Sequence, residues 1–157
     1  MGAKIERTST KRGKDGESLD RLLADEFVLS MRTRDAHRNV HGRNLIELRK
    51  LFKVQYESMD TIVADLGTRM RTSGVLPPSI LADFLPITRL SRHNERFTKQ
   101  NQIIEALLDD HESIIDALRN DGSTAPREHI DAGTAGFVTG LLGRHEKMAL
   151  ALKDWLR

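Results

Sequence analysis

The chain has 157 residues, of which 38% are hydrophobic and 31% charged, and it contains no cysteine. This length suits one domain that buries its own core, and the missing cysteine excludes disulfides and thiolate metal sites, as is typical of a cytosolic protein. No apolar run approaches the roughly 20 residues that span a membrane, and no apolar segment near the N-terminus indicates a signal peptide.

The first 16 residues are basic and almost free of apolar side chains. Two acids stand among five cations, which leaves a local charge of +3, more than the +2 of the whole chain. The composition predicts a flexible tail over residues 1–16, ahead of a folded domain over residues 17–157. Such a tail can bind DNA phosphates by releasing counterions, although an ordinary solvated terminus is the alternative. The candidate DNA contacts are Lys4, Arg7, Lys11, Arg12 and Lys14.

Apolar residues at helical spacing predict a first helix over residues 18–41, and Gly42 is expected to end it as a left-handed cap. The side chains predicted to face inward are Leu19, Leu22, Leu23, Phe27 and Met31.

A second helix is predicted from Leu45 to Thr72. Asn44 stands at the N-cap position, and Glu47 follows three residues later, as in a capping box. Gly74 is expected to stop this helix. The predicted inward side chains are Leu45, Leu48, Phe52, Met59, Ile62, Leu66 and Met70.

Three prolines, Pro77, Pro78 and Pro86, surround a short apolar segment. We expect a short helix over residues 79–85 within a long crossover. A crossover of this kind allows the helices before and after it to run parallel, as in ferritin-like bundles.

Two further helices are predicted, over residues 98–120, closed by Gly122, and over residues 127–156. Together the four long helices predict an all-α, ferritin-like four-helix bundle with a short extra helix in the crossover between the second and third. His111 and His145 lie on the apolar stripes of these helices, so we expect them to be buried and hydrogen-bonded. The other inward residues are predicted to be Ile104, Leu107, Ile115, Leu118, Ile130, Phe137, Leu141, Met148 and Leu152.

The segment HRNVHGRNL, residues 37–45, resembles a motif of the Dps family, His-Trp-Asn-Val-x-Gly-x-Asn-Phe. Dps proteins are mini-ferritins that bind and protect bacterial DNA. Collinear similarities extend the resemblance from about residue 18 to residue 156; they are LLADEF at 22–27, LLDDHE at 107–112, GTA at 133–135, TGL at 139–141 and HEKMA at 145–149.

The resemblance implies a cytoplasmic stress protein of the bacterial nucleoid. It implies a hollow homododecamer that oxidises iron between two-fold-related subunits, stores the mineral inside, and binds and condenses double-stranded DNA without sequence preference. No membrane is expected among its partners.

The family's iron-oxidising centre uses two histidines and an acid from one subunit, and an Asp and a Glu four residues apart from its partner. The first histidine matches His37, and the other positions fall on Arg49, Lys53, Ala64 and Thr68. Arginine and protonated lysine have no lone pair for Fe(II), and their charge repels it. The sequence therefore predicts lost or weak ferroxidase activity, with His37 as a weak or vestigial ligand. No cofactor is expected, and iron binding is expected only if the family activity persists.

Arg49 and Lys53 are expected either to pair with acids of a partner subunit or to face solvent; the candidate acids are Glu57, Asp60 and Asp65. Three functions stay open. The leading one is a DNA-binding protein that protects DNA by physical shielding. The others are a mini-ferritin that oxidises and stores iron at a rearranged site, and a structural subunit that co-assembles with an active paralogue.

Overall fold

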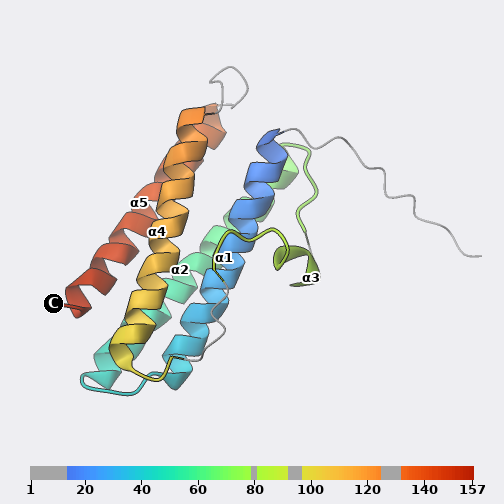
Figure 1. Cartoon of the computed structure of the whole chain (residues 1–157). Coiled ribbons are helices and arrows are strands. Elements are labelled where there is room, and N and C mark those ends of the chain that lie inside the picture. Colours follow the sequence, from blue (N-terminus) through green and yellow to red (C-terminus); the bar gives the residue numbers. More distant parts are fainter. Residues whose placement is uncertain (1–13, 79–80, 92–96, 125–131) are drawn as a thin grey trace, which may run out of the picture.

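The computed structural model describes residues 14–78, 81–91, 97–124 and 132–157, with only the backbone of 14–15, 81 and 121–124 (Figure 1). All elements in these ranges are helices, which confirms the predicted all-α class. None of the described helices is long and apolar enough to cross a membrane. The elements are α1 (Lys14–Asn39), α2 (Leu45–Thr72), α3 (Leu81–Phe84), α4 (Gln100–Thr124) and α5 (Ala132–Trp155).

The four long helices form two antiparallel hairpins, α1–α2 and α4–α5 (Figure 1). The hairpins meet where α1 packs on α4 and α2 packs on α5, so α1 and α5 lie diagonally opposite each other. Both α2 and α4 run from bottom to top in Figure 1. The crossover between them therefore makes them parallel, as predicted, and α3 within it packs on α1.

Helix α2 has the predicted bounds, and its C-terminal end follows a Schellman pattern. The N–H of Val75 donates to the carbonyl of Met70 at 2.8 Å, and Gly74 has φ +76°. Glycine adopts this left-handed conformation without the steric cost that a Cβ brings. The predicted capping box at the other end is wrong. Asn44 has φ +52° and makes no side-chain cap hydrogen bond, because a capping side chain reaches the first-turn N–H groups from an extended backbone.

Other helix ends differ from the predictions by a few residues. Helix α1 begins at Lys14, four residues early, and α4 continues through Gly122 to Thr124. The prediction that Gly122 closes the helix is wrong, because a glycine costs a helix only about 1 kcal/mol and does not by itself end it. Gly42 has φ +146°, a conformation that L side chains rarely adopt, and a Cβ there would also displace the end of the Gln100 side chain. The predicted starts near residues 79 and 127 lie outside the described residues.

The inward row of α1 agrees in part with the predicted one, since Leu19, Leu22 and Leu23 are buried and Phe27 is partly buried, packed against the core. Met31 is 47% exposed, so its predicted burial is wrong. The buried row instead alternates four- and three-residue steps, which keep side chains on one helix face. This row includes two polar residues that a search for hydrophobic spacing passes over; its members are Leu22, Glu26, Leu29, Thr33, Ala36 and Val40.

Two buried or partly buried ion pairs attach the crossover and the second hairpin to α1. The buried carboxylate of Asp25 accepts hydrogen bonds from the Thr88 hydroxyl and from the Arg89 N–H and Nε, each at 2.7 Å. Arg32 donates to both carboxylate oxygens of Asp110, at 2.6 and 2.7 Å, and also to the carbonyl of Ser91. Hydrogen bonds between a guanidinium and a carboxylate are charge-assisted and therefore stronger than neutral ones.

Candidate functional site

Four of the five predicted DNA contacts lie outside the residues that the structure describes, and the fifth is the first residue described. Lys4, Arg7, Lys11 and Arg12 lie outside the described residues. Lys14 is the first residue of α1, and its side chain is not described. The tail therefore stays a prediction.

His37, the matched metal-ligand position, packs against an aromatic ring. Its imidazole meets the ring of Tyr56 on α2 edge-on, with centroids 5.6 Å apart. The guanidinium of Arg34 lies 4.2 Å from the centroid of the same ring and pairs with Asp60, which also accepts a 2.8 Å bond from Ser30. We call these five residues the Tyr56 cluster. It joins the C-terminal half of α1 to the middle of α2.

The two basic replacements lie on α2. Lys53 pairs with Glu57 of its own helix at 3.0 Å, and the hydrogen bond and charge of Glu57 raise the pKa of Lys53. Arg49 is partly exposed, and its Nε has no hydrogen-bond partner in the described structure. The remaining candidate acids also meet cations of their own chain, since Asp60 pairs with Arg34 and Asp65 lies 4.0 Å from Arg144.

The last two ligand positions offer no acidic donor. Ala64 and Thr68 are exposed on α2, and the Thr68 hydroxyl donates to the carbonyl of Ala64 at 3.1 Å. Of the five positions only His37 carries a side chain that readily binds Fe(II). Within the described ranges, no three or more His, Cys, Asp or Glu side chains are grouped so that they could hold a metal ion.

A second histidine group lies in the centre of the bundle. The Oε1 of Glu26 on α1 is 2.5 Å from the Nε2 of His145 on α5, and the Nδ1 of His145 is 2.9 Å from the Nδ1 of His111 on α4. All three side chains are fully buried. The burial and hydrogen bonding predicted for His111 and His145 are confirmed. Glu26 was missed, and the signal for it was its place between Leu22 and Leu29 in the inward row of α1.

This buried chain of polar groups, which we call the core chain, is incompletely paired at its ends. Burial, and the nearby His145, lower the pKa of His111 well below its usual value of 6.5. Its Nε2, like the Oε2 of Glu26, is buried without a hydrogen-bond partner in the described part of the protein. His111 is therefore neutral at physiological pH.

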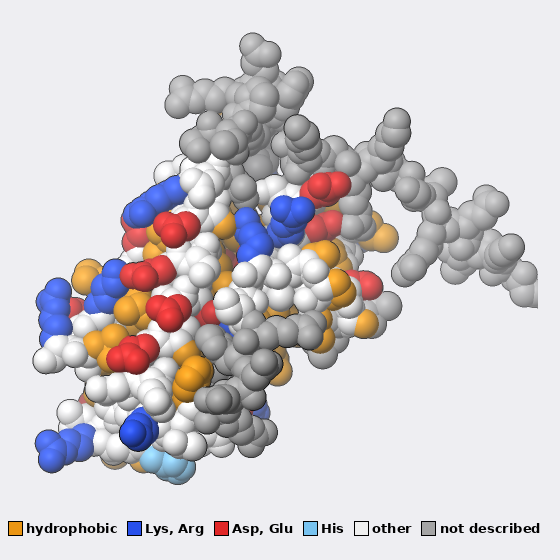
Figure 2. Space-filling model, in the orientation of Figure 1, with side chains coloured by type: hydrophobic (Ala, Val, Ile, Leu, Met, Phe, Trp, Pro, Cys, Tyr) orange, Lys and Arg blue, Asp and Glu red, His pale blue; other side chains and the backbone are white. Residues whose placement is uncertain are grey.

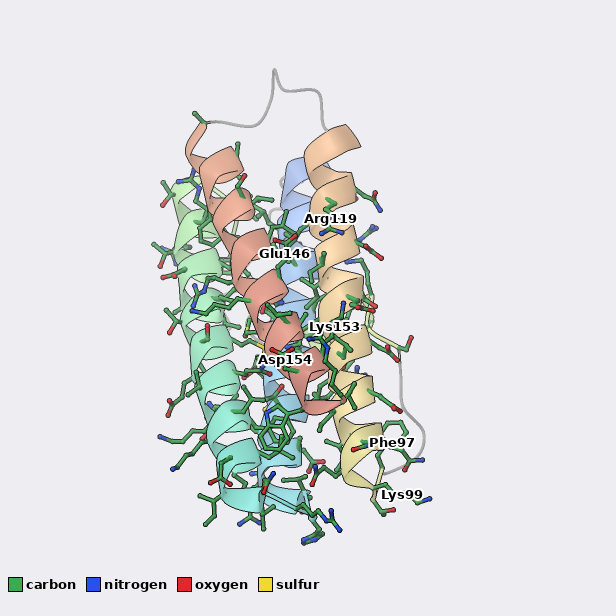
Figure 3. All side chains as sticks on the ribbon, turned by 90° about the vertical axis from the view of Figure 1, so that its left-hand side faces the viewer. Phe97, Lys99, Arg119, Glu146, Lys153 and Asp154 are labelled. Carbon is green, nitrogen blue, oxygen red and sulfur yellow. The ribbon has the colours of Figure 1, made fainter. Side chains whose placement is uncertain are left out.

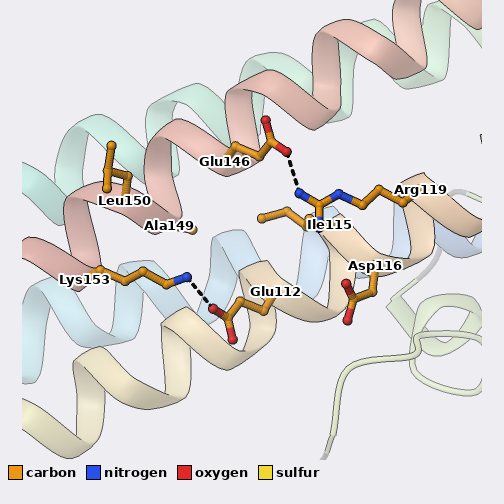
Figure 4. A pocket seen from close by; sticks show the side chains of 8 residues that line it. All are labelled: Glu112, Ile115, Asp116, Arg119, Glu146, Ala149, Leu150 and Lys153. Carbon is orange, nitrogen blue, oxygen red and sulfur yellow. Dashed lines mark hydrogen bonds and ion pairs between the residues drawn. The ribbon is translucent and has the colours of Figure 1, made fainter.

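The outer face of α4 and α5 carries an open groove of about 460 Å³ (Figure 4). Arg119 crosses it to Glu146 at 2.8 Å (Figures 3 and 4), and Lys153 crosses it to Glu112 at 2.7 Å (Figure 4). Figure 2 shows a row of acidic side chains on this face with basic side chains beside it. Because its cations are already paired with acids, the groove is poorly suited to bind phosphates.

Comparison with known proteins places these observations in a family. Residues 16–157 match the model of the ferritin-like domain. A low temperature-induced protein of Nostoc, itself uncharacterized, is 30% identical over 138 residues, which cover 88% of this chain and 77% of that protein. The DNA protection during starvation protein of Helicobacter pylori is 26% identical over 140 residues, 89% of this chain and 96% of that one.

Solved structures show the same similarity. Dps from Thermosynechococcus elongatus superposes with a TM-score of 0.84 at 26% identity, covering 90% of this chain and 89% of that chain. Dps from Listeria monocytogenes gives a TM-score of 0.85, covering 93% and 95%; at 18% identity this match speaks for the fold alone.

Proposed function

We propose, from the premise that this chain belongs to the ferritin-like family and fits its Dps branch, that it forms a DNA-protecting protein shell. The shell is a homo-oligomer, expected to be a dodecamer, that binds double-stranded DNA without reading its sequence. It acts in the bacterial cytoplasm, at the nucleoid, and protects DNA mainly by covering it.

The proposal is supported by the side chains at the five positions matched to the family's metal ligands: four of them are Arg49, Lys53, Ala64 and Thr68, while the described residues still form the helical bundle. Fe(II), the substrate of the family reaction, would meet Arg49 and Lys53 where imidazole and carboxylate are needed. Each cation repels a divalent ion by several kcal/mol at distances of about 4 to 6 Å and intermediate dielectric. His37 alone cannot supply a coordination shell.

DNA binding is supported by the charge of the tail and by the name of the Helicobacter pylori relative. Each tail carries +3 within its first 16 residues. Twelve copies would present roughly +36 on one particle, which gives avidity even when each tail binds weakly. Such binding must weaken steeply with added salt.

The DNA test compares the full chain with a variant that lacks residues 2–13, so that α1 remains whole. The matched control keeps the tail length but replaces Lys4, Arg7, Lys11 and Arg12 with glutamine. We expect both variants to lose gel retention of a double-stranded fragment, while the full chain loses it only as salt is raised. Unchanged retention by both variants would place the DNA contact on another surface.

The iron test is an aerobic Fe(II) oxidation assay on the same preparation. We expect no oxidation above the buffer rate. A fast rate that saturates with Fe(II) would favour the alternative of a rearranged iron site, for which the described residues offer no three-donor group. Co-assembly with an active paralogue stays a prediction, which native mass spectrometry of purified particles would test.

A further inference from the structure

We propose that the core chain of Glu26, His145 and His111 is an acid-sensitive contact between the two helical hairpins. It holds the α1–α2 hairpin to the α4–α5 hairpin when its protons are correctly placed, and it loosens when the cluster takes up one proton more. This inference does not depend on the proposed DNA-binding function.

The position of the core chain gives it this role. Helices α1 and α5 lie diagonally across the bundle and do not pack on each other. The contact between Glu26 and His145 at 2.5 Å therefore crosses the bundle axis and joins one hairpin to the other. His111, on α4, supports His145 from the side at 2.9 Å. With all three side chains fully buried, no water replaces a bond that is lost.

Proton counting shows why the contact is sensitive to acid. Two Nδ1 atoms 2.9 Å apart need one proton between them, because one must donate and the other accept. A net-neutral arrangement satisfies both contacts. In it, His145 carries both ring protons and donates from Nε2 to the Glu26 carboxylate and from Nδ1 to His111. With one proton fewer both contacts are also satisfied, because His111 then donates from its Nδ1 to His145, so the net-neutral arrangement is the most protonated one that keeps both bonds.

One further proton can bind to His111 or to Glu26, and in either place it weakens the contacts of the core chain. On His111 it sets two N–H groups against each other and buries a second positive charge. On Glu26 it removes the negative charge that offsets the imidazolium. The depressed pKa of His111, caused first by burial and then by His145, agrees with the first of these costs.

Other titratable groups near this layer are already engaged. From α1, Asp25 binds Arg89, and Asp20 lies about two turns before Glu26. From α4, Asp110 binds Arg32. The buried polar residue that α2 presents is Gln55, which does not titrate; its amide donates to the carbonyl of Met148 at 3.0 Å.

The sign of the pH effect follows from linkage. His111 titrates near its usual 6.5 in the unfolded chain but well below it when folded. Its contribution to stability is therefore complete above 6.5 and is lost as the pH falls below that value.

The test is urea unfolding of the full-length protein at pH 7 and at pH 5, followed by the fluorescence of Trp155. The variant His111→Asn keeps a hydrogen-bonding group near the Nδ1 position but cannot titrate. We expect the unfolding constant of the natural chain to rise several-fold more between the two pH values than that of the variant, up to about 20-fold if His111 stays neutral in the folded protein at pH 5. His37→Gln, which removes a histidine of the Tyr56 cluster, should respond to pH as the natural chain does. Equal responses of the natural chain and His111→Asn would overturn the proposal.

A second measurement needs no variant, so it covers the case in which His111→Asn does not fold. Hydrogen–deuterium exchange of the natural protein, corrected for intrinsic rates, is compared at pH 7 and 5.5. We expect faster opening in peptides from the middle of α1 and α5 and little change at the loop between α1 and α2. Acceleration that is uniform along the chain, or absent from α1 and α5, would contradict the acid-sensitive contact.

Discussion

Two histidine groups of this protein, the core chain and the Tyr56 cluster, share residue types but differ in their burial and in the partners of their charged groups. Both contain an imidazole and a carboxylate, and both join helices. In the core chain every group is fully buried and each bond is directed at the next group. In the Tyr56 cluster, Asp60 is exposed, Arg34 neutralises its charge, and His37 faces an aromatic edge rather than a carboxylate.

Residue type alone therefore does not define a site; access to water and the neighbouring charges do. A buried carboxylate and imidazole depend on each other because nothing else can satisfy them. The exposed groups of the Tyr56 cluster exchange partners with water at little cost. The same side-chain types thus contribute strongly to stability in the core chain and contribute little to it in the Tyr56 cluster. Neither group has donors that converge on one point, as a metal ion needs.

The largest effect is expected from Glu26→Ala. Removing one partner of a buried pair leaves His145 without its acceptor and costs about 3 to 5 kcal/mol of stability. Urea unfolding at pH 7 measures this loss. The control Glu47→Ala removes an exposed glutamate and should cost less than about 1 kcal/mol. Equal costs for the two variants would mean that the core chain contributes no more than a surface charge.

Arg32→Ala tests an ion pair of intermediate burial. It removes the Arg32 guanidinium from the carboxylate of Asp110, which is 3% exposed, and removes the bond to the crossover at Ser91. We expect a loss of about 2 to 3 kcal/mol. Arg119→Ala breaks an exposed pair with Glu146 and should cost less than about 1 kcal/mol. If Arg119→Ala lost more stability than Arg32→Ala, burial of the ion pair would not explain the difference between the two variants.

A third variant adds metal donors on α2, the helix that carries Tyr56. The fourfold variant Arg49→His, Lys53→Asp, Ala64→Asp and Thr68→Glu restores the donor types of the family at the matched positions. Because it replaces two repelling cations with donors, Fe(II) oxidation should rise at least about tenfold over the natural chain. The twofold variant Arg49→His, Lys53→Asp is the control and should stay near background. No gain in the fourfold variant would show that something other than the missing donors blocks the reaction.

The smallest effect is expected within the Tyr56 cluster itself. Arg34→Ala removes the cation over the Tyr56 ring and the pair with Asp60, both partly open to solvent. We expect a cost of about 0.5 to 1 kcal/mol. Asp60→Asn and the double variant complete a thermodynamic cycle, and a coupling above about 2 kcal/mol would put this cluster in the same class as the core chain.

The four long helices and their approximate ends follow from local sequence signals. Periodicity and glycine position predicted a helix that starts after Asn44 and ends at about Thr72, which agrees with the observed α2, because these signals act within a few residues of the chain. The sequence also predicted that His111 and His145 are buried, since each stands on an apolar stripe. Likewise, the absence of donors at Arg49, Lys53, Ala64 and Thr68 could be read directly from the residues.

Only the tertiary structure decided which face of α1 points inward and which charges meet. Met31 is outside and Glu26 inside because the rotation of α1 is set by its packing against α2 and α4, not by its own composition. The pairing of Glu26 with His145 joins residues 119 positions apart, and no local pattern encodes such a contact. The physical reason is that burial and charge pairing belong to the space between helices, which exists only after they pack.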